Sequence, residues 1–179
     1  MITSGAMTLF AGAKQKGSYR ETDPTDKEKE ESDMAATAGM IVGAGWVTLG
    51  TVMGFKKWSG ARLAEVKRIP GKDKRADLAR ERIAEEALEY ASSTTSTLET
   101  LSVITNFATS LYLVSYATDE NRVYGLLAAT TSFLPWLFPN VYQTTYEKHL
   151  EYKKKIYAPL VGIGFGNKLE PMMNWTWNF

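Results

Sequence analysis

The chain has 179 residues, a formal net charge of +1 and no cysteine. This balance gives no global attraction to nucleic acid or to an acidic substrate, and the lack of cysteine excludes disulfides and thiolate chemistry. Because His149 is the one histidine, a histidine-rich metal site or a Ser-His-Asp triad is not expected, and we predict no catalytic set, metal or cofactor.

Residues 1–33 are predicted to form a polar N-terminal arm. Residues 14–33 carry five basic and seven acidic side chains and no large aliphatic one, which is typical of a solvated segment. Residues 11–13 have the small-x-small form of a signal-peptidase site, but the basic region of a signal peptide is missing, so a remnant of one stays open. Ser32 or Asp33 is predicted to cap the next helix.

Residues 34–55 form the first predicted transmembrane helix. The segment runs 22 residues without a charge, which at about 1.5 Å per residue is enough to cross the hydrocarbon core of a bilayer. It contains two Gly-x-x-x-Gly units, Gly39/Gly43 and Gly50/Gly54. At about 100° per residue the four glycines share a sector of roughly 60°. We therefore predict a helix-packing face, whose partner is this chain, a copy of it or another subunit.

Residues 56–91 are predicted to form a basic loop followed by an amphipathic helix. Between 56 and 75 there are eight basic and two acidic side chains, with room for a short helix over residues 61–69. Anionic lipid headgroups are the expected partners of its cations. Nucleic acid is disfavoured, because Trp58 is the one aromatic residue among the positive charges. The predicted interface cations are Lys56, Lys57, Arg62, Lys67 and Arg68.

No glycine or proline occurs from Lys72 to Tyr124, which predicts one long helix that continues into a second transmembrane segment over residues 92–117. Glu99 and Asn106 lie seven residues apart on one face of this segment. One hypothesis is a proton or ion site at Glu99. The favoured interpretation is structural, with Glu99 near the headgroups and Asn106 hydrogen-bonded to Thr130 or Thr131.

Residues 122–139 are the third predicted transmembrane helix, which prolines should shorten or bend. Residues 140–179 are predicted to form an amphipathic helix, with His149 on its surface, and then an irregular tail. The glycines at 162, 164 and 166 are interpreted as a structural turn, since the Lys-Ser/Thr pair of a P-loop is missing and no helix clearly begins after them. Trp136, Trp175 and Trp177 are predicted interface anchors. The alternating aromatics of the tail also resemble the last strand of an outer-membrane barrel.

The distribution of charge predicts an orientation. The basic segments 56–75 and 144–155 lie on one side of a three-span protein, and the more acidic segments 14–33 and 118–122 lie on the other. By the positive-inside rule the basic side is the cytoplasm, matrix or stroma, and the N-terminal arm is on the outer side. A bacterial inner or organellar inner membrane is expected, and an outer membrane is less favoured.

The predicted class is an all-α integral membrane protein with about three transmembrane helices and one long helix that extends out of the membrane. A soluble or peripheral helical bundle is the competing architecture. The leading functional hypothesis is a non-catalytic accessory or assembly subunit of a membrane complex, in contact with other membrane subunits or with copies of itself. The alternatives are a small transport subunit that uses Glu99 and an outer-membrane-associated protein.

Overall fold

The computed structural model describes residues 1–19, 24–55, 58–138, 140–157, 160–165 and 171–176. The described residues are predominantly helical, which confirms the predicted helical class. The elements in chain order are α1 (Ile2–Gln15), α2 (Asp26–Phe55), α3 (Trp58–Arg68), α4 (Lys74–Tyr116), α5 (Asp119–Thr131), α6 (Leu134–Leu137), α7 (Val141–Tyr157), β1 (Leu160–Phe165) and β2 (Pro171–Thr176).

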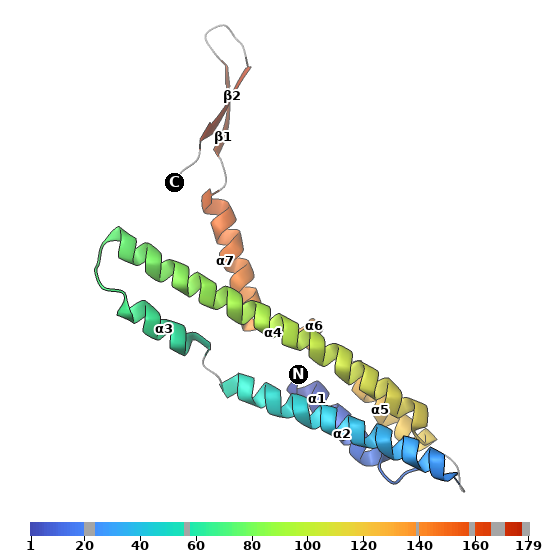
Figure 1. Ribbon diagram of the computed structural model, residues 1–179. Helices are drawn as coiled ribbons and strands as arrows, with labels where there is room; N and C mark the ends of the chain where they lie inside the picture. Colours follow the sequence, from blue (N-terminus) through green and yellow to red (C-terminus); the bar gives the residue numbers. More distant parts are fainter. Residues whose placement is uncertain (20–23, 56–57, 139, 158–159, 166–170, 177–179) are drawn as a thin grey trace.

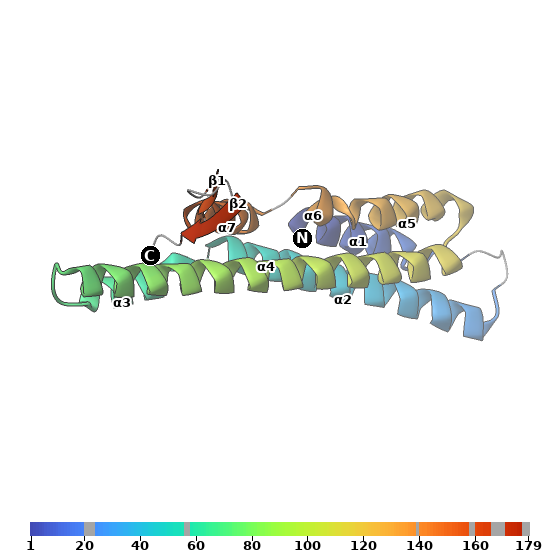
Figure 2. The ribbon, with the colours of Figure 1, turned by 90° about the horizontal axis from the view of Figure 1, so that it is seen from above.

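The long helix α4 is the axis of the molecule (Figure 1). Helices α2 and α3 follow one another along it, while α1 and α5 gather around one half (Figure 2). We call α1, α2, α5 and residues 92–116 of α4 the bundle end. We call α3, α7 and residues 74–91 of α4 the projecting end; the β1–β2 hairpin extends beyond α7 (Figure 1).

The first fifteen residues are not part of a polar arm. They form α1, whose inner face of small side chains packs against α2 more extensively than any other pair of helices in the described part. Small residues permit this, because they leave little side chain between two helix backbones. The expectation for residues 1–33 is therefore wrong for α1.

Helix α2 also begins earlier than expected. The hydroxyl and backbone N–H of Thr25 donate to the Glu28 carboxylate at 2.7 and 2.8 Å, and the Glu28 N–H donates back to the Thr25 hydroxyl. This reciprocal pattern is a capping box. The helix thus starts at Asp26 rather than at a cap on Ser32 or Asp33, and the charged residues before Met34 form its first two turns.

The predicted long helix is confirmed: α4 is continuous over 43 residues, about 65 Å. Asp73 caps it by accepting a hydrogen bond from the Ala76 N–H at 3.2 Å. Gly71 has a φ of +95° in the turn from α3, a conformation that suits glycine. The Arg80 guanidinium donates to the carbonyls of Ile69 and Gly71 and ties this turn to α4.

The third apolar block is divided into α5 and α6, with Pro135 in the first turn of α6. Thr118 caps α5, which has 13 residues and so a length of only about 20 Å. Within the described ranges, α2 alone is long and apolar enough to cross a bilayer by length and composition. The three-span topology therefore stays a prediction.

The C-terminal segment is more ordered than the irregular tail that we expected. Strands β1 and β2 pair antiparallel, with Val161 opposite Trp175 and Ile163 opposite Met173. In β1, Val161, Ile163 and Phe165 alternate with glycine, and β-branched and aromatic residues at alternate positions favour a strand over a helix. The described fold is thus helical with one β-hairpin, and not strictly all-α.

Candidate functional site

Glycines hold α1 and α2 at close range. A Cβ atom added to Gly12 would lie 2.7 Å from the Ala36 carbonyl oxygen, and one added to Gly43 would overlap the backbone of Leu9 and Gly5. The two helices run antiparallel, because Gly5 lies against Gly43 whereas Gly12 lies against Gly39. The partner of this part of the glycine face is therefore a helix of the same chain.

The other two glycines of the predicted face differ from each other. A Cβ atom on Gly50 would lie 2.6 Å from the Ile2 side chain, whereas one on Gly54 would meet nothing within 4 Å. The sector of small residues in α2 thus extends beyond the length of α1. Gly54 has no contact of this kind in the described molecule.

Glu99 lies on the buried face of α4, where this helix meets the start of α7. Its carboxylate accepts hydrogen bonds from the side-chain amides of Asn140 at 3.4 Å and Gln143 at 3.3 Å. Asn140 also accepts the Tyr142 N–H and so caps α7. A carboxylate at the N-terminus of a helix is stabilised by the helix dipole, so this arrangement anchors α7 to α4.

Asn106 is fully buried, but it does not bridge to α5 as expected. Its amide donates to the carbonyl and hydroxyl oxygens of Ser102, one turn earlier in α4. Thr130 and Thr131 instead donate to carbonyls of their own helix. The Asn106 Oδ1 and Ser110 Oγ atoms have no hydrogen-bond partner among the described residues.

Gln15 is a structural residue that our sequence reasoning missed, because it was assigned to a solvated arm. It is buried, and its amide donates to the Ser32 hydroxyl at 2.9 Å and to the Tyr116 carbonyl at 2.7 Å. One side chain thus joins the ends of α1, α2 and α4. The signal that could have found it is the spacing of Ser4, Thr8, Ala11 and Gln15, which places small and polar residues on one helix face.

The described members of the predicted interface set are spread over α3, α6 and β2. Arg62, Lys67 and Arg68 are exposed on α3, where the Arg62 guanidinium pairs with Glu65 at 2.9 Å. Trp136 is exposed on α6 and packs against Phe133. Trp175 belongs to β2. Lys56, Lys57 and Trp177 lie outside the described residues.

His149 is not a free surface residue. Its Nε2 atom lies 2.9 Å from Glu85 Oε1, and Lys153 Nζ donates to Glu85 Oε2 at 2.5 Å. These contacts connect α7 to the charged half of α4. The hydrogen bond from Lys153, with a smaller contribution from His149, lowers the pKa of the Glu85 carboxyl.

Large apolar side chains lie on the outside of the bundle end, whereas its interior is small and polar. The buried hydrophobic residues of the described part are alanines together with Val103 and Leu113, and eleven buried residues are polar or charged. The exposed apolar side chains of this end include Ile41 and Val52 of α2, Leu101, Ile104 and Leu111 of α4, and Val123, Leu126 and Leu127 of α5. This is the reverse of the usual order in a protein surrounded by water.

Comparisons with protein-family models, with curated proteins and with solved structures found no match for this chain.

Proposed function

We propose that this protein is embedded in a membrane through its bundle end and acts as a non-catalytic accessory or assembly subunit of a larger membrane complex. The observation that carries the membrane location is the reversed distribution of side chains. In water, an outer surface of leucine, isoleucine and valine on α2, α4 and α5 would oppose solubility. In lipid it is favourable, and the interior is then free for small residues and internal hydrogen bonds.

The competing architecture is a soluble bundle whose apolar surface is covered by a protein partner. The exposed apolar residues belong to three different helices, whereas a single partner covers one continuous patch. A surrounding lipid phase accounts for all three helices at once. The glycine contact between α1 and α2 is also of the kind that membrane helices use, where burial of large side chains brings no advantage over lipid.

The contacts of Glu99 support a structural role for this protein rather than a catalytic one. The carboxylate of Glu99 is engaged by two side-chain amides that hold α7 in place. A catalytic acid or base works with a partner acid, base or nucleophile, whereas the side chains that donate to Glu99 are amides. The projecting end instead offers a charged helix pair and α7, and the long α4 links both to the bundle.

The orientation proposed from the charges changes at one point. Because α1 and α2 are antiparallel, the end of α1 lies near the start of α2, and Ile2 lies against Gly50 near the end of α2. The end of α1 and the start of α2 are then on the outer side, and the first residues of α1 lie toward the inner side with α3 and α7. The membrane remains a bacterial inner or organellar inner one in this proposal.

A transport role is the second candidate, and one cavity favours it. A hollow of about 240 Å³ lies beside Glu99 and is lined also by Ser96, Thr100 and Trp136. If Glu99 carries protons or ions, Glu99→Gln abolishes flux in reconstituted vesicles while the protein stays folded. A Glu99→Gln variant with unchanged flux removes this candidate.

The test of the main proposal begins with extraction of native membranes at alkaline pH. The protein stays in the membrane pellet if it is integral, and its release would contradict the membrane location. Mild detergent, a native gel and mass spectrometry of the band then follow. Co-migration with a defined set of other subunits supports an accessory role, whereas a small assembly of this chain alone argues against it. Density separation of inner and outer membranes decides between the two bacterial locations.

A further inference from the structure

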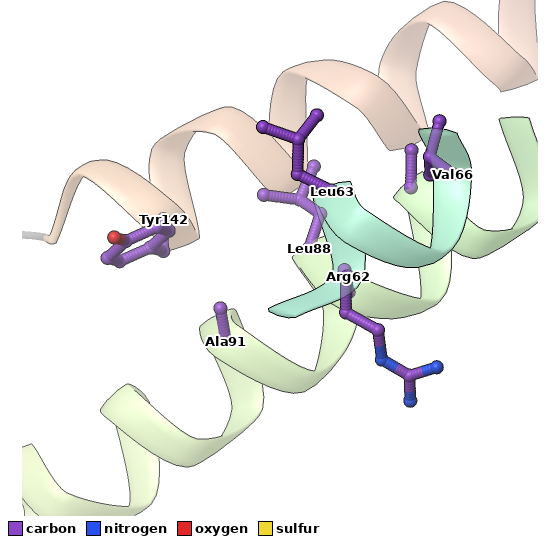
Figure 3. Close-up of a pocket in the computed structure, with 8 residues that line it drawn as sticks. Arg62, Leu63, Val66, Leu88, Ala91 and Tyr142 are labelled. Atoms are coloured by element: carbon purple, nitrogen blue, oxygen red, sulfur yellow. The ribbon is translucent and has the colours of Figure 1, made fainter. Parts of the chain in front are cut away.

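An apolar groove lies at the projecting end, outside the glycine contact and the Glu99 region. It is a hollow of about 230 Å³ between α3, α4 and the start of α7 (Figure 3). Side chains from three helices that are separate in sequence form its wall. They include Leu63 and Val66 of α3, Ala87, Leu88 and Ala91 of α4, and Tyr142 of α7.

The position of the groove relates it to lipid. Helix α3 follows closely after the exposed Phe55, and α7 follows the exposed apolar run of Trp136, Leu137 and Phe138. Ala91 lies where the charged half of α4 gives way to the apolar half. The groove therefore begins where the apolar outer surface of the bundle ends, and a hydrocarbon chain from the adjacent leaflet can enter it without crossing water.

The charge around the groove is positive on the α3 side. Arg62 itself lines the hollow, and Lys67 and Arg68 are exposed on the same helix, against one acidic residue, Glu65. A guanidinium is well suited to a phosphate, since it donates two parallel hydrogen bonds. The Arg62–Glu65 pair is exposed to solvent, so a competing anion can replace the carboxylate at small cost.

We propose that this groove binds one acyl chain of an anionic phospholipid, whose phosphate lies against Arg62. The proposal rests on the membrane location proposed above, and it adds a defined lipid site to it. The bound lipid would fill the space between α3 and α7 and so hold the projecting end close to the membrane surface.

The first arm of the test fills the groove in the full-length protein. The purified protein in detergent is titrated with dioleoyl-phosphatidylglycerol, and bound lipid is counted by native mass spectrometry. Ala87→Trp places a large side chain among the lining residues. We expect at least about a tenfold loss of affinity, because displacing two buried methylene groups has an effect of that size. The matched control is Ala79→Trp, on the same helix at an exposed position outside the groove, which should bind as the natural protein does.

The second arm tests the headgroup with dioleoyl-phosphatidylcholine, which has the same acyl chains and no net charge. The natural protein should prefer phosphatidylglycerol. Arg62→Gln should bring the ratio of the affinities for phosphatidylglycerol and phosphatidylcholine close to one. The affinity for phosphatidylcholine itself should stay unchanged. Glu65→Gln removes the partner of Arg62 but keeps the cation, so it should retain the preference.

Two results would overturn the lipid site. One is an Ala87→Trp variant that binds phosphatidylglycerol as tightly as the natural protein; the other is an equal loss in Ala87→Trp and Ala79→Trp. Either result leaves the membrane location intact as long as alkaline extraction retains the protein in the pellet. Release of the natural protein by alkali would instead contradict the membrane location itself.

Discussion

The bundle end and the projecting end are packed by different means, although α4 runs through both. At the bundle end, helices approach through glycine, alanine and serine, and the large apolar side chains point outward. At the projecting end, charged residues share the surface with exposed apolar side chains such as Leu78 and Val141. Contacts of Glu85 with His149 and Lys153 hold α7 to α4 there. The change occurs near Ala91, within one uninterrupted helix.

This difference points to two surroundings for one helix. In water, large apolar side chains are stabilised by burial and charged ones by exposure. In lipid, burial of large apolar groups contributes little free energy, because the lipid tails are themselves apolar. Helices there associate through close backbone contact and internal hydrogen bonds. Four substitution experiments, in order of decreasing expected effect, test whether the two ends lie in different surroundings.

The largest effect is expected at the α1–α2 contact. Gly43→Leu places a side chain where the backbones of Leu9 and Gly5 already lie, and it should destabilise the bundle by more than about 3 kcal/mol. Thermal unfolding of the detergent-solubilised protein, followed by circular dichroism, measures this loss. The control is Gly54→Leu, where a Cβ meets nothing within 4 Å, and the unfolding temperature should stay the same or rise. Equal losses in the two variants would contradict a specific glycine contact.

The second experiment compares an exposed apolar residue at each end. Ile41 on α2 and Leu78 on α4 are similarly exposed, at 68% and 63%. If the bundle end lies in lipid, Ile41→Asp should disfavour membrane insertion by about 3 kcal/mol, since a carboxylate in the middle of a span is costly. Leu78→Asp should leave insertion unchanged. For each variant, the fraction of the full-length chain that stays in the membrane pellet after alkaline extraction measures insertion. Equal fractions for the two variants would contradict the proposal that the bundle end lies in lipid and the projecting end in water.

The third experiment tests the polar interior. Gln15→Ala removes the amide that joins Ser32 to the Tyr116 carbonyl. The Tyr116 carbonyl loses this donor, at a cost of about 1–3 kcal/mol, while the Ser32 hydroxyl keeps its hydrogen bond to the Ser18 carbonyl. Hydrogen exchange should show faster opening at the end of α4 and the start of α5. The neighbouring Lys16 is exposed, so Lys16→Ala should exchange as the natural protein does. Unchanged protection of these amides from exchange in Gln15→Ala would show that the Gln15 hydrogen bonds do not stabilise this end of the bundle.

The smallest effect is expected at Glu85, where docking of α7 should depend on pH. The pKa of Glu85 is lowered in the folded protein, so its contribution is present above the unfolded value of about 4.3 and is lost as pH falls through the folded pKa. The contribution should be about 1 kcal/mol or less, because the pair is partly exposed. Spin labels on α4 and α7 should separate below about pH 4.

Glu85→Gln should weaken this docking at neutral pH and reduce its pH dependence. The control is Glu86→Gln, since Glu86 pairs with Arg82 on the same helix and does not hold α7. A distance between the labels that is constant across this pH range in the natural protein would contradict the expected role of Glu85.

The sequence predicted the parts of this fold that depend on local patterns. The absence of glycine and proline over residues 72–124 predicted the continuous α4, and the prolines at 135 and 139 predicted the break after α5. The apolar run at 34–55 and the change of character near residue 91 were visible without a structure. Each of these depends on helix propensity or on hydropathy along one segment.

The candidate site was harder to predict, because it depends on which helices become neighbours. Residues 1–15 have no strong signal of their own, and their face of small residues has meaning only opposite the glycines of α2. The hydrogen bonds of Gln15 to Tyr116 and of Glu99 to Asn140 span 101 and 41 residues of sequence. A pattern within one segment determines which side chains share a helix face, and it was enough to predict α4 and the apolar part of α2. Helix α1 and the partner of each face emerged only from the tertiary packing, because they depend on which helices become neighbours.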